Sequence, residues 1–237
     1  MAEQKKTSKK IVKAEGSTEA KRTVKEAPKT GNATGLRIGA VVLWLAAFGL
    51  EVLALMIFCG NVTLSFLPLS TLAQVIVMLV LDLILVIIGS QLWKKSNHID
   101  PASEKNKLKF WLWNNMGVIA CVIAFVPFIV LALTNKEADA KTKKIASIVA
   151  IVALLIGGIA SYDFNPISAE EKAEAMAELG DTMVYWTPFG KVYHTDIDCQ
   201  AMNRTDTVTE GTVEQAIAAN RTRLCKYCEN RDAAAGE

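Results

Sequence analysis

Long apolar blocks alternate with short polar segments along most of the chain. Four blocks consist almost entirely of apolar side chains, and most charged residues lie between them or at the two ends. About 20 apolar residues in helical form cross the hydrocarbon core of a bilayer. The blocks therefore predict a bundle of four transmembrane helices within residues 36–162, at 36–58, 67–93, 110–133 and 145–162.

Two prolines qualify this pattern. Pro68 lies where the second helix is predicted to begin, and a proline is tolerated there because the missing N–H would have no partner within the helix. Pro127 lies inside the third block and predicts a bend in that helix. The fourth block is the shortest and contains Gly157 and Gly158.

Lysine and arginine predict the orientation of the bundle. Residues 1–35 carry nine Lys or Arg against four Glu, the connection at 59–66 is uncharged, and the connection after the second helix is rich in lysine. The positive-inside rule then places the N-terminus in the cytoplasm. The third connection, 134–144, is expected outside but carries four lysines. Because the first helices usually dominate, we expect four spans in the cell membrane with both termini cytoplasmic.

The remaining segments are polar. Residues 1–35 lack an apolar face and are predicted to be a disordered basic tail, drawn to anionic lipid. Residues 163–180 form an acidic linker or a short helix, 181–230 a small α+β domain, and 231–237 a second tail.

Within the small domain, strand-like segments at 183–186 and 191–194 flank the turn residues 187–190. Thr212 and Gln215 have the spacing of a capping box that opens a helix. Asn220 is suited to a left-handed residue that ends this helix.

The same domain contains a pattern of metal ligands. His194 and Cys199 are separated by four residues, and Cys225-x2-Cys228 follows after twenty-five more. Three thiolates and one imidazole fill a tetrahedral Zn²⁺ shell and leave no position for water, which predicts one structural zinc ion. Free or buried cysteines, or a redox pair at Cys225 and Cys228, are the alternatives, but no thioredoxin-like βαβ pattern surrounds the pair.

These residues also carry a resemblance. Val192-Tyr193-His194, Cys199, the helix from Thr212 and Cys225-Lys226-Tyr227-Cys228 make residues 184–230 similar to the metal-binding domain of the Ada DNA-repair family, and more so to Tyr-His-Cys modules appended to many bacterial proteins. The resemblance implies the fold and the zinc ion.

Methyl transfer from DNA, the activity of the Ada family, is not implied. The methyl-accepting position of that family is a cysteine, and here it is His194. Residues 181–237 carry nine acids against six bases, which is opposite to the charge balance that a phosphate-binding surface needs. DNA-related chemistry and nucleic acid as a partner are therefore disfavoured.

Glu51 and Asp82 are isolated acids inside apolar blocks. Ionisable groups at such positions are costly and often functional. At 1.5 Å per residue, both lie about 18–21 Å from the basic ends of their helices, so they are predicted to meet at one level. They form either a proton or cation site, or a pair of protonated acids that hydrogen-bond between helices.

Composition adds little to this picture. Hydrophobic residues make up 51% of the chain, and the net charge of +2 indicates no particular partner. We expect a non-enzymatic membrane protein whose zinc-stabilised module binds a protein partner, and self-association stays open. The alternative is a small proton- or cation-coupled transporter that uses Glu51 and Asp82.

Overall fold

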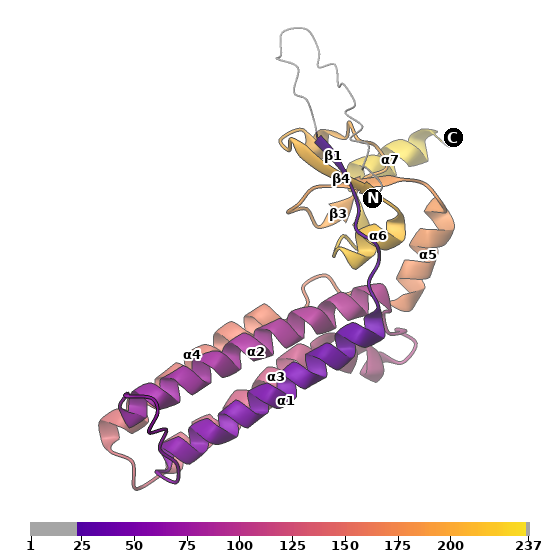
Figure 1. The fold of residues 1–237 in the computed structure, drawn as a ribbon. Coiled ribbons are helices and arrows are strands. Elements are labelled where there is room, and N and C mark those ends of the chain that lie inside the picture. Colours follow the sequence, from indigo (N-terminus) through magenta and orange to yellow (C-terminus); the bar gives the residue numbers. More distant parts are fainter. Residues whose placement is uncertain (1–22, 236–237) are drawn as a thin grey trace, which may run out of the picture. The chain divides into compact units, whose positions relative to one another are not determined.

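The computed structural model describes residues 23–235, and residues 1–22 and 236–237 lie outside the described part. Long helices dominate it (Figure 1). The helices are α1 (Ala33–Phe58), α2 (Thr71–Ile99), α3 (Lys107–Thr134), α4 (Ala140–Ser161), α5 (Ala169–Leu179), α6 (Val213–Ala218) and α7 (Lys226–Ala235), with one 3₁₀ turn, η1 (Gln200–Met202). The strands are β1 (Thr23–Glu26), β2 (Val184–Trp186), β3 (Val192–Tyr193), β4 (Thr207–Gly211) and β5 (Arg223–Leu224).

The described chain divides into two compact units. The helical bundle consists of Asn32–Asn97 and Asn106–Phe164 and contains α1 to α4. The C-terminal unit gathers three separate segments: 23–31, His98–Lys105 and the residues from Asn165 onward. The four predicted apolar helices are therefore present, and each is long and apolar enough to cross a bilayer.

Side-chain caps explain why the helices start earlier than hydropathy predicts. The Asn32 side chain accepts hydrogen bonds from the N–H groups of Thr34 and Gly35, so α1 begins at Ala33. Asp139 caps the lysine-rich start of α4 in the same way. Such caps satisfy N–H groups that have no partner within the helix, so polar residues can form the first turn.

The second helix differs from the prediction at both ends. It begins at Thr71 rather than at 67, so Pro68 lies in the connection before it. The buried Gln74 amide holds that connection by donating to the carbonyls of Leu64, Leu67 and Leu69. At its other end the helix continues to Ile99.

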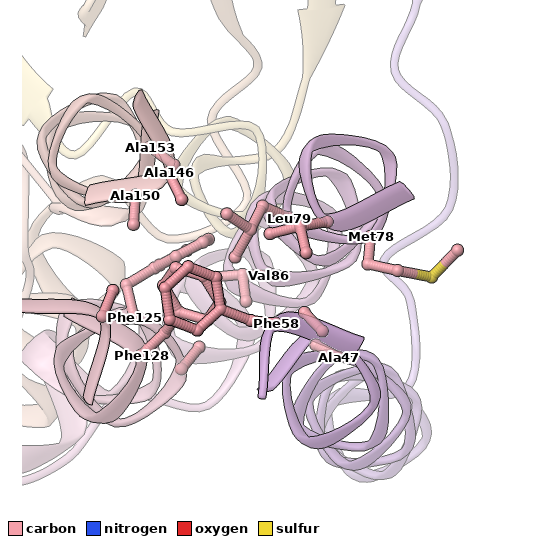
Figure 2. Close-up of a cluster of buried hydrophobic side chains, with 14 of the residues drawn as sticks. Ala47, Phe58, Met78, Leu79, Val86, Phe125, Phe128, Ala146, Ala150 and Ala153 are labelled. Atoms are coloured by element: carbon pink, nitrogen blue, oxygen red, sulfur yellow. The ribbon is translucent and has the colours of Figure 1, made fainter. Parts of the chain in front are cut away.

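The core of the bundle is built from aromatic side chains of α1 and α3 against aliphatic residues of α2 and alanines of α4 (Figure 2). Phe58 and Phe128 meet edge to face, with 5.6 Å between ring centroids. Ala146, Ala150 and Ala153 give α4 a face of small residues. Small residues allow neighbouring helices to approach closely.

Gly157 continues this face of α4. A Cβ atom at Gly157 would lie 2.7 Å from Cys121 Sγ of α3 and 3.0 Å from Leu83 of α2. The glycine is therefore needed for the close approach of the helices and does not interrupt α4, which runs unbroken to Ser161.

The C-terminal unit contains two small sheets. In the first, β4 lies between β1, which is parallel to it, and β2, which is antiparallel. In the second, β3 pairs in parallel with β5. The predicted strands at 183–186 and 191–194 correspond to the shorter β2 and β3.

The capping box of Thr212 and Gln215 is confirmed, and so is the left-handed conformation of Asn220, at φ 66°. Pro166 and Ile167 precede α5, which a second capping box between Ser168 and Glu171 opens. The acidic segment at 163–180, which was predicted to be a linker or a short helix, therefore contains a helix.

The two predicted tails were drawn too long. Residues 23–26 form β1, because their backbone pairs with β4 in the register Thr23↔Thr207 to Glu26↔Glu210. Charged side chains can occupy an edge strand, since one side of such a strand faces solvent. At the other end, α7 continues beyond Asn230 to Ala235. The tail prediction for residues 1–22 falls outside the described residues.

Candidate metal centre

Local backbone structure places the four predicted ligands. His194 follows β3, and its backbone exchanges two 2.8 Å hydrogen bonds with Tyr185 of β2. Cys225 follows β5, and its N–H donates to the Tyr193 carbonyl at 2.9 Å. Because β3 and β5 are parallel, the residues that follow them emerge at the same end of the sheet. Cys199 precedes the turn η1, and Cys228 lies in the first turns of α7.

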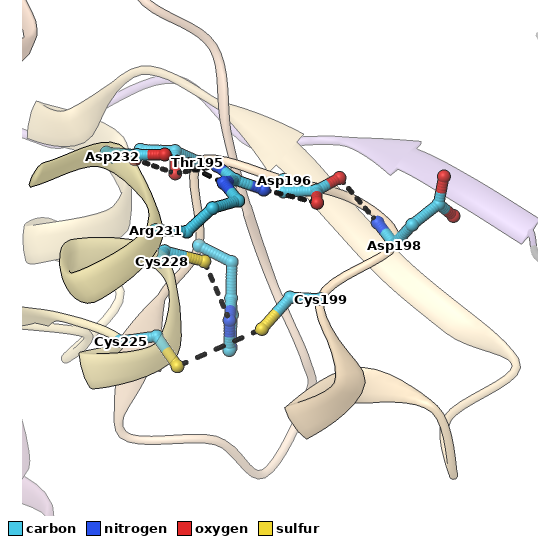
Figure 3. A network of polar contacts seen from close by, with 9 residues as sticks. Thr195, Asp196, Asp198, Cys199, Cys225, Cys228, Arg231 and Asp232 are labelled. Atoms are coloured by element: carbon cyan, nitrogen blue, oxygen red, sulfur yellow. Dashed lines mark hydrogen bonds and ion pairs between the residues drawn. The ribbon is translucent and has the colours of Figure 1, made fainter. Parts of the chain in front are cut away.

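The four side chains converge on one point (Figure 3). All four potential ligand atoms lie within 4.8 Å of one another. The Sγ atoms of Cys199 and Cys225 are 4.0 Å apart, and Cys228 Sγ is 3.8 Å from Nδ1 of His194. A tetrahedral site with metal–sulfur bonds of about 2.3 Å has sulfur–sulfur edges of about 3.8 Å. These two separations are close to the edges of a tetrahedral site, and the four residues could hold a metal ion.

The chemistry of the cluster also fits a cation. All four residues are buried, and no disulfide involves the three cysteines. Burial raises the pKa of the Cys199 thiol to about 12 and lowers the pKa of His194, so without a cation both groups remain neutral. A bound metal ion reverses this preference for a thiol, because its charge stabilises the thiolate.

An outer network ties the loop that carries Cys199 to α7 (Figure 3). Arg231, one helical turn after Cys228, forms ion pairs with Asp196 and Asp232 and donates to the Thr195 hydroxyl at 3.1 Å. The Thr195 hydroxyl in turn donates to Asp232 at 2.6 Å, and this bond, followed by that of Arg231, lowers the pKa of the Asp232 carboxyl.

This network was not predicted from the sequence. Its one signal is the spacing between Cys228 and Arg231, because residues three apart lie on the same side of a helix. The network links the segment between His194 and Cys199 to the helix that carries Cys228.

The second predicted pair, Glu51 and Asp82, lies in the helical bundle. Both side chains are buried, and they are close enough for their charges to interact. Glu51 Oε1 accepts a hydrogen bond of 3.1 Å from the backbone N–H of Phe128, next to Pro127 in α3. Glu51 Oε2 and both carboxylate oxygens of Asp82 have no hydrogen-bond partner among the described residues.

Comparison of the chain with protein-family models, with curated proteins and with solved structures gave no significant match in any of the three.

Proposed function

We propose that the chain is an integral membrane protein in which α1 to α4 span the bilayer and the C-terminal unit is a zinc-stabilised module that binds a protein partner. The surface of the bundle supports insertion. Ile38, Leu45, Leu155 and Ile159 are each more than 60% exposed, within helices of mean hydropathy 2.2 to 2.8. An apolar surface that extends over whole helices is stable in lipid rather than in water.

The strand pairing supports a topology with both ends of the chain on one side. Strand β1 precedes the first apolar helix and β4 follows the last, yet the two pair directly. The C-terminal unit also includes His98–Lys105, which connects α2 to α3. Three segments can meet in this way when the helices between them cross the membrane an even number of times.

With an even number of crossings, the third connection lies on the side opposite to both termini, although it is rich in lysine. Lys141, Lys143 and Lys144 belong to the first turns of α4, and Lys143 Nζ donates to the Asn135 carbonyl at 2.6 Å. They are thus part of a capped helix end. We place both termini in the cytoplasm, on the lysine-rich side of the first three helices.

The ligand set supports zinc in a structural role. Three cysteines and one histidine complete a four-coordinate shell, so no position remains for a substrate or a reactive water. Such a site stabilises a small domain and supplies no catalysis. We therefore propose a non-enzymatic interaction module, similar to the Tyr-His-Cys modules of bacterial proteins.

Metal analysis of the full chain, purified in detergent, tests the module. One zinc per chain is expected, and Cys228→Ser should lose it. Cys121→Ser is the matched control, because Cys121 is a buried cysteine of the bundle, far from the cluster in sequence. Zinc that survives in Cys228→Ser, or that is lost equally in both variants, would refute the site.

Thiol labelling in intact cells tests the topology. Cys59 is exposed in the connection after α1, so a membrane-impermeant reagent should label it, and Cys59→Ala provides the background. Phe189 lies 99% exposed on a turn of the C-terminal unit. A cysteine in place of Phe189 should react only after permeabilisation. Labelling of this position in intact cells would overturn the proposed orientation.

A second candidate function is a proton site at Glu51 and Asp82. Three of their four carboxylate oxygens are buried and have no hydrogen-bond partner among the described residues, and the like charges of two neighbouring carboxylates favour a proton on at least one of them. We propose that these acids bind and release a proton within the bundle. Proton flux into proteoliposomes that Glu51→Gln abolishes would support this function. Equal flux in the variant, or none in the native chain, would leave the pair a structural contact between helices.

A further inference from the structure

A groove runs through the C-terminal unit beside the metal centre. Its volume is about 610 Å³, and it lies between α5 on one side and β5 with the start of α7 on the other. The buried side chains of Ile167 and Tyr193 and the half-buried Leu224 contribute apolar surface to it. Tyr227 lines the groove and is 58% exposed.

One wall of the groove is acidic. Glu171, Glu174 and Glu178 are exposed and follow one face of α5, and Glu229 of α7 adds a fourth carboxylate. Glu171 caps the start of α5, but Glu174 and Glu178 form no ion pair with any residue that the structure describes. Arg223 and Lys226 offset only part of this negative charge.

A ligand that fits such a groove combines positive charge with a few apolar side chains, since it must pair with the glutamates and also cover the apolar surface.

We propose that this groove binds the chain's own N-terminal segment, residues 5–13. That segment reads Lys-Lys-Thr-Ser-Lys-Lys-Ile-Val-Lys, with five lysines and no acid, and its two apolar residues, Ile11 and Val12, lie between lysines. It thus has the composition that the groove requires. In this arrangement the segment covers the apolar and acidic surface of the groove.

The connection is long enough for this contact. Lys13 is ten residues from Thr23, the first residue of β1, and ten extended residues span about 33 Å. Strand β1 belongs to the same unit as the groove. A unit of roughly 90 residues has a radius of gyration of about 12 Å, so the extended connection is about as long as the unit is wide.

Because the segment belongs to the same chain as the groove, even a weak contact is enough to fill the groove. A connection of about ten residues gives an effective concentration in the millimolar range. Binding with a dissociation constant of about 1 mM therefore already occupies the groove about half of the time. Anionic lipid competes for the same lysines, so the occupancy should fall near a charged membrane.

Photo-crosslinking in the full chain tests this proposal. Benzoylphenylalanine in place of Ile11 should crosslink, within one molecule, to peptides that line the groove, as mapped by mass spectrometry. Glu174→Lys with Glu178→Lys should reduce this crosslink at least tenfold. Further exchange of Lys9, Lys10 and Lys13 for Glu should restore it, because the charges are then reversed on both sides.

The matched control exchanges Asp181 and Asp206 for Lys. Both acids are exposed in the same unit but do not line the groove, so the crosslink should persist. Crosslinks between two copies, crosslinks to lipid alone in uncharged nanodiscs, or no dependence on Glu174 and Glu178 would each overturn the proposal. The groove proposal rests on the proposed zinc module, so zinc content is measured in every variant. A variant that keeps its zinc but loses the crosslink has lost only this contact, whereas a variant that loses its zinc has lost the module.

Discussion

Removal of the Glu51 carboxyl group should destabilise the bundle through the backbone of α3. Pro127 lies inside α3, and the N–H of the next residue, Phe128, donates to Glu51 Oε1 at 3.1 Å. Glu51 is 1% exposed and Phe128 is fully buried, so no water replaces a lost acceptor. An orphaned buried donor costs about 1–3 kcal/mol. Glu51→Leu should carry this cost, whereas Glu51→Gln retains an acceptor oxygen.

A double-mutant cycle isolates the contribution. In Pro127→Ala the proline ring no longer crowds the preceding turn, so the Phe128 N–H can bond more closely to the Ala124 carbonyl, four residues before it. Glu51→Leu should then cost less than it does with proline present, with a coupling of about 1–2 kcal/mol, within the usual range for residues in contact. Reversible unfolding in mixed detergent, followed by tryptophan fluorescence, measures all four chains. Additive effects within error would refute the role of Glu51 as a backbone acceptor.

Three further predictions concern the C-terminal unit. Asn220 has φ 66°, so Asn220→Ala should lower its stability by about 1 kcal/mol while Asn220→Gly is close to neutral, as measured by thermal unfolding; equal effects would contradict the strain argument. Arg231→Ala should weaken zinc binding about tenfold in chelator competition, because the loop at Asp196 loses its link to α7; unchanged affinity would make that network irrelevant to the metal. Burial, followed by the hydrogen bond to Glu210, raises the pKa of Tyr185 to about 12. Because the pKa of the Tyr185 phenol is higher in the folded than in the unfolded state, it stabilises the folded state below about pH 10, and this contribution is lost as the pH rises through about 12. In an ultraviolet titration, the last phenol of the native chain to ionise should be missing from Tyr185→Phe.

Local signals in the sequence explain which parts of the fold could be predicted. The apolar blocks identify α1 to α4, because a helix that is apolar on all sides needs no tertiary information to be recognised. Thr212 and Gln215 are three residues apart and fix the start of α6 by their own hydrogen bonds. The metal ligands could be predicted because chelation requires particular residue types at short spacing.

Features that depend on distant contacts could not be predicted. Thr23 and Thr207 lie at opposite ends of the chain, and nothing within β1 itself distinguishes it from a polar tail. The start of α2 depends on which carbonyls the Gln74 side chain reaches, and so on the folded shape of the preceding connection. Glu51 was recognised as an unusual acid, but its bond to Phe128 requires the packing of α1 on α3.

The parallel pairing of β1 with β4 also determines the order in which this protein can be completed. Strand β1 leaves the ribosome first, and β4 is made only after all four apolar helices. At about 5–20 residues per second, roughly ten to forty seconds separate the two strands. During that interval β1 has no partner within its own chain, and on a polysome the finished β4 of a chain further ahead is nearby. The central strand β4 can pair in the same register with β1 of its own chain or with β1 of another copy. Synthesis at a high local density of chains should therefore favour strand-swapped dimers, and synthesis at a low density should favour the monomer that pairs with its own β1.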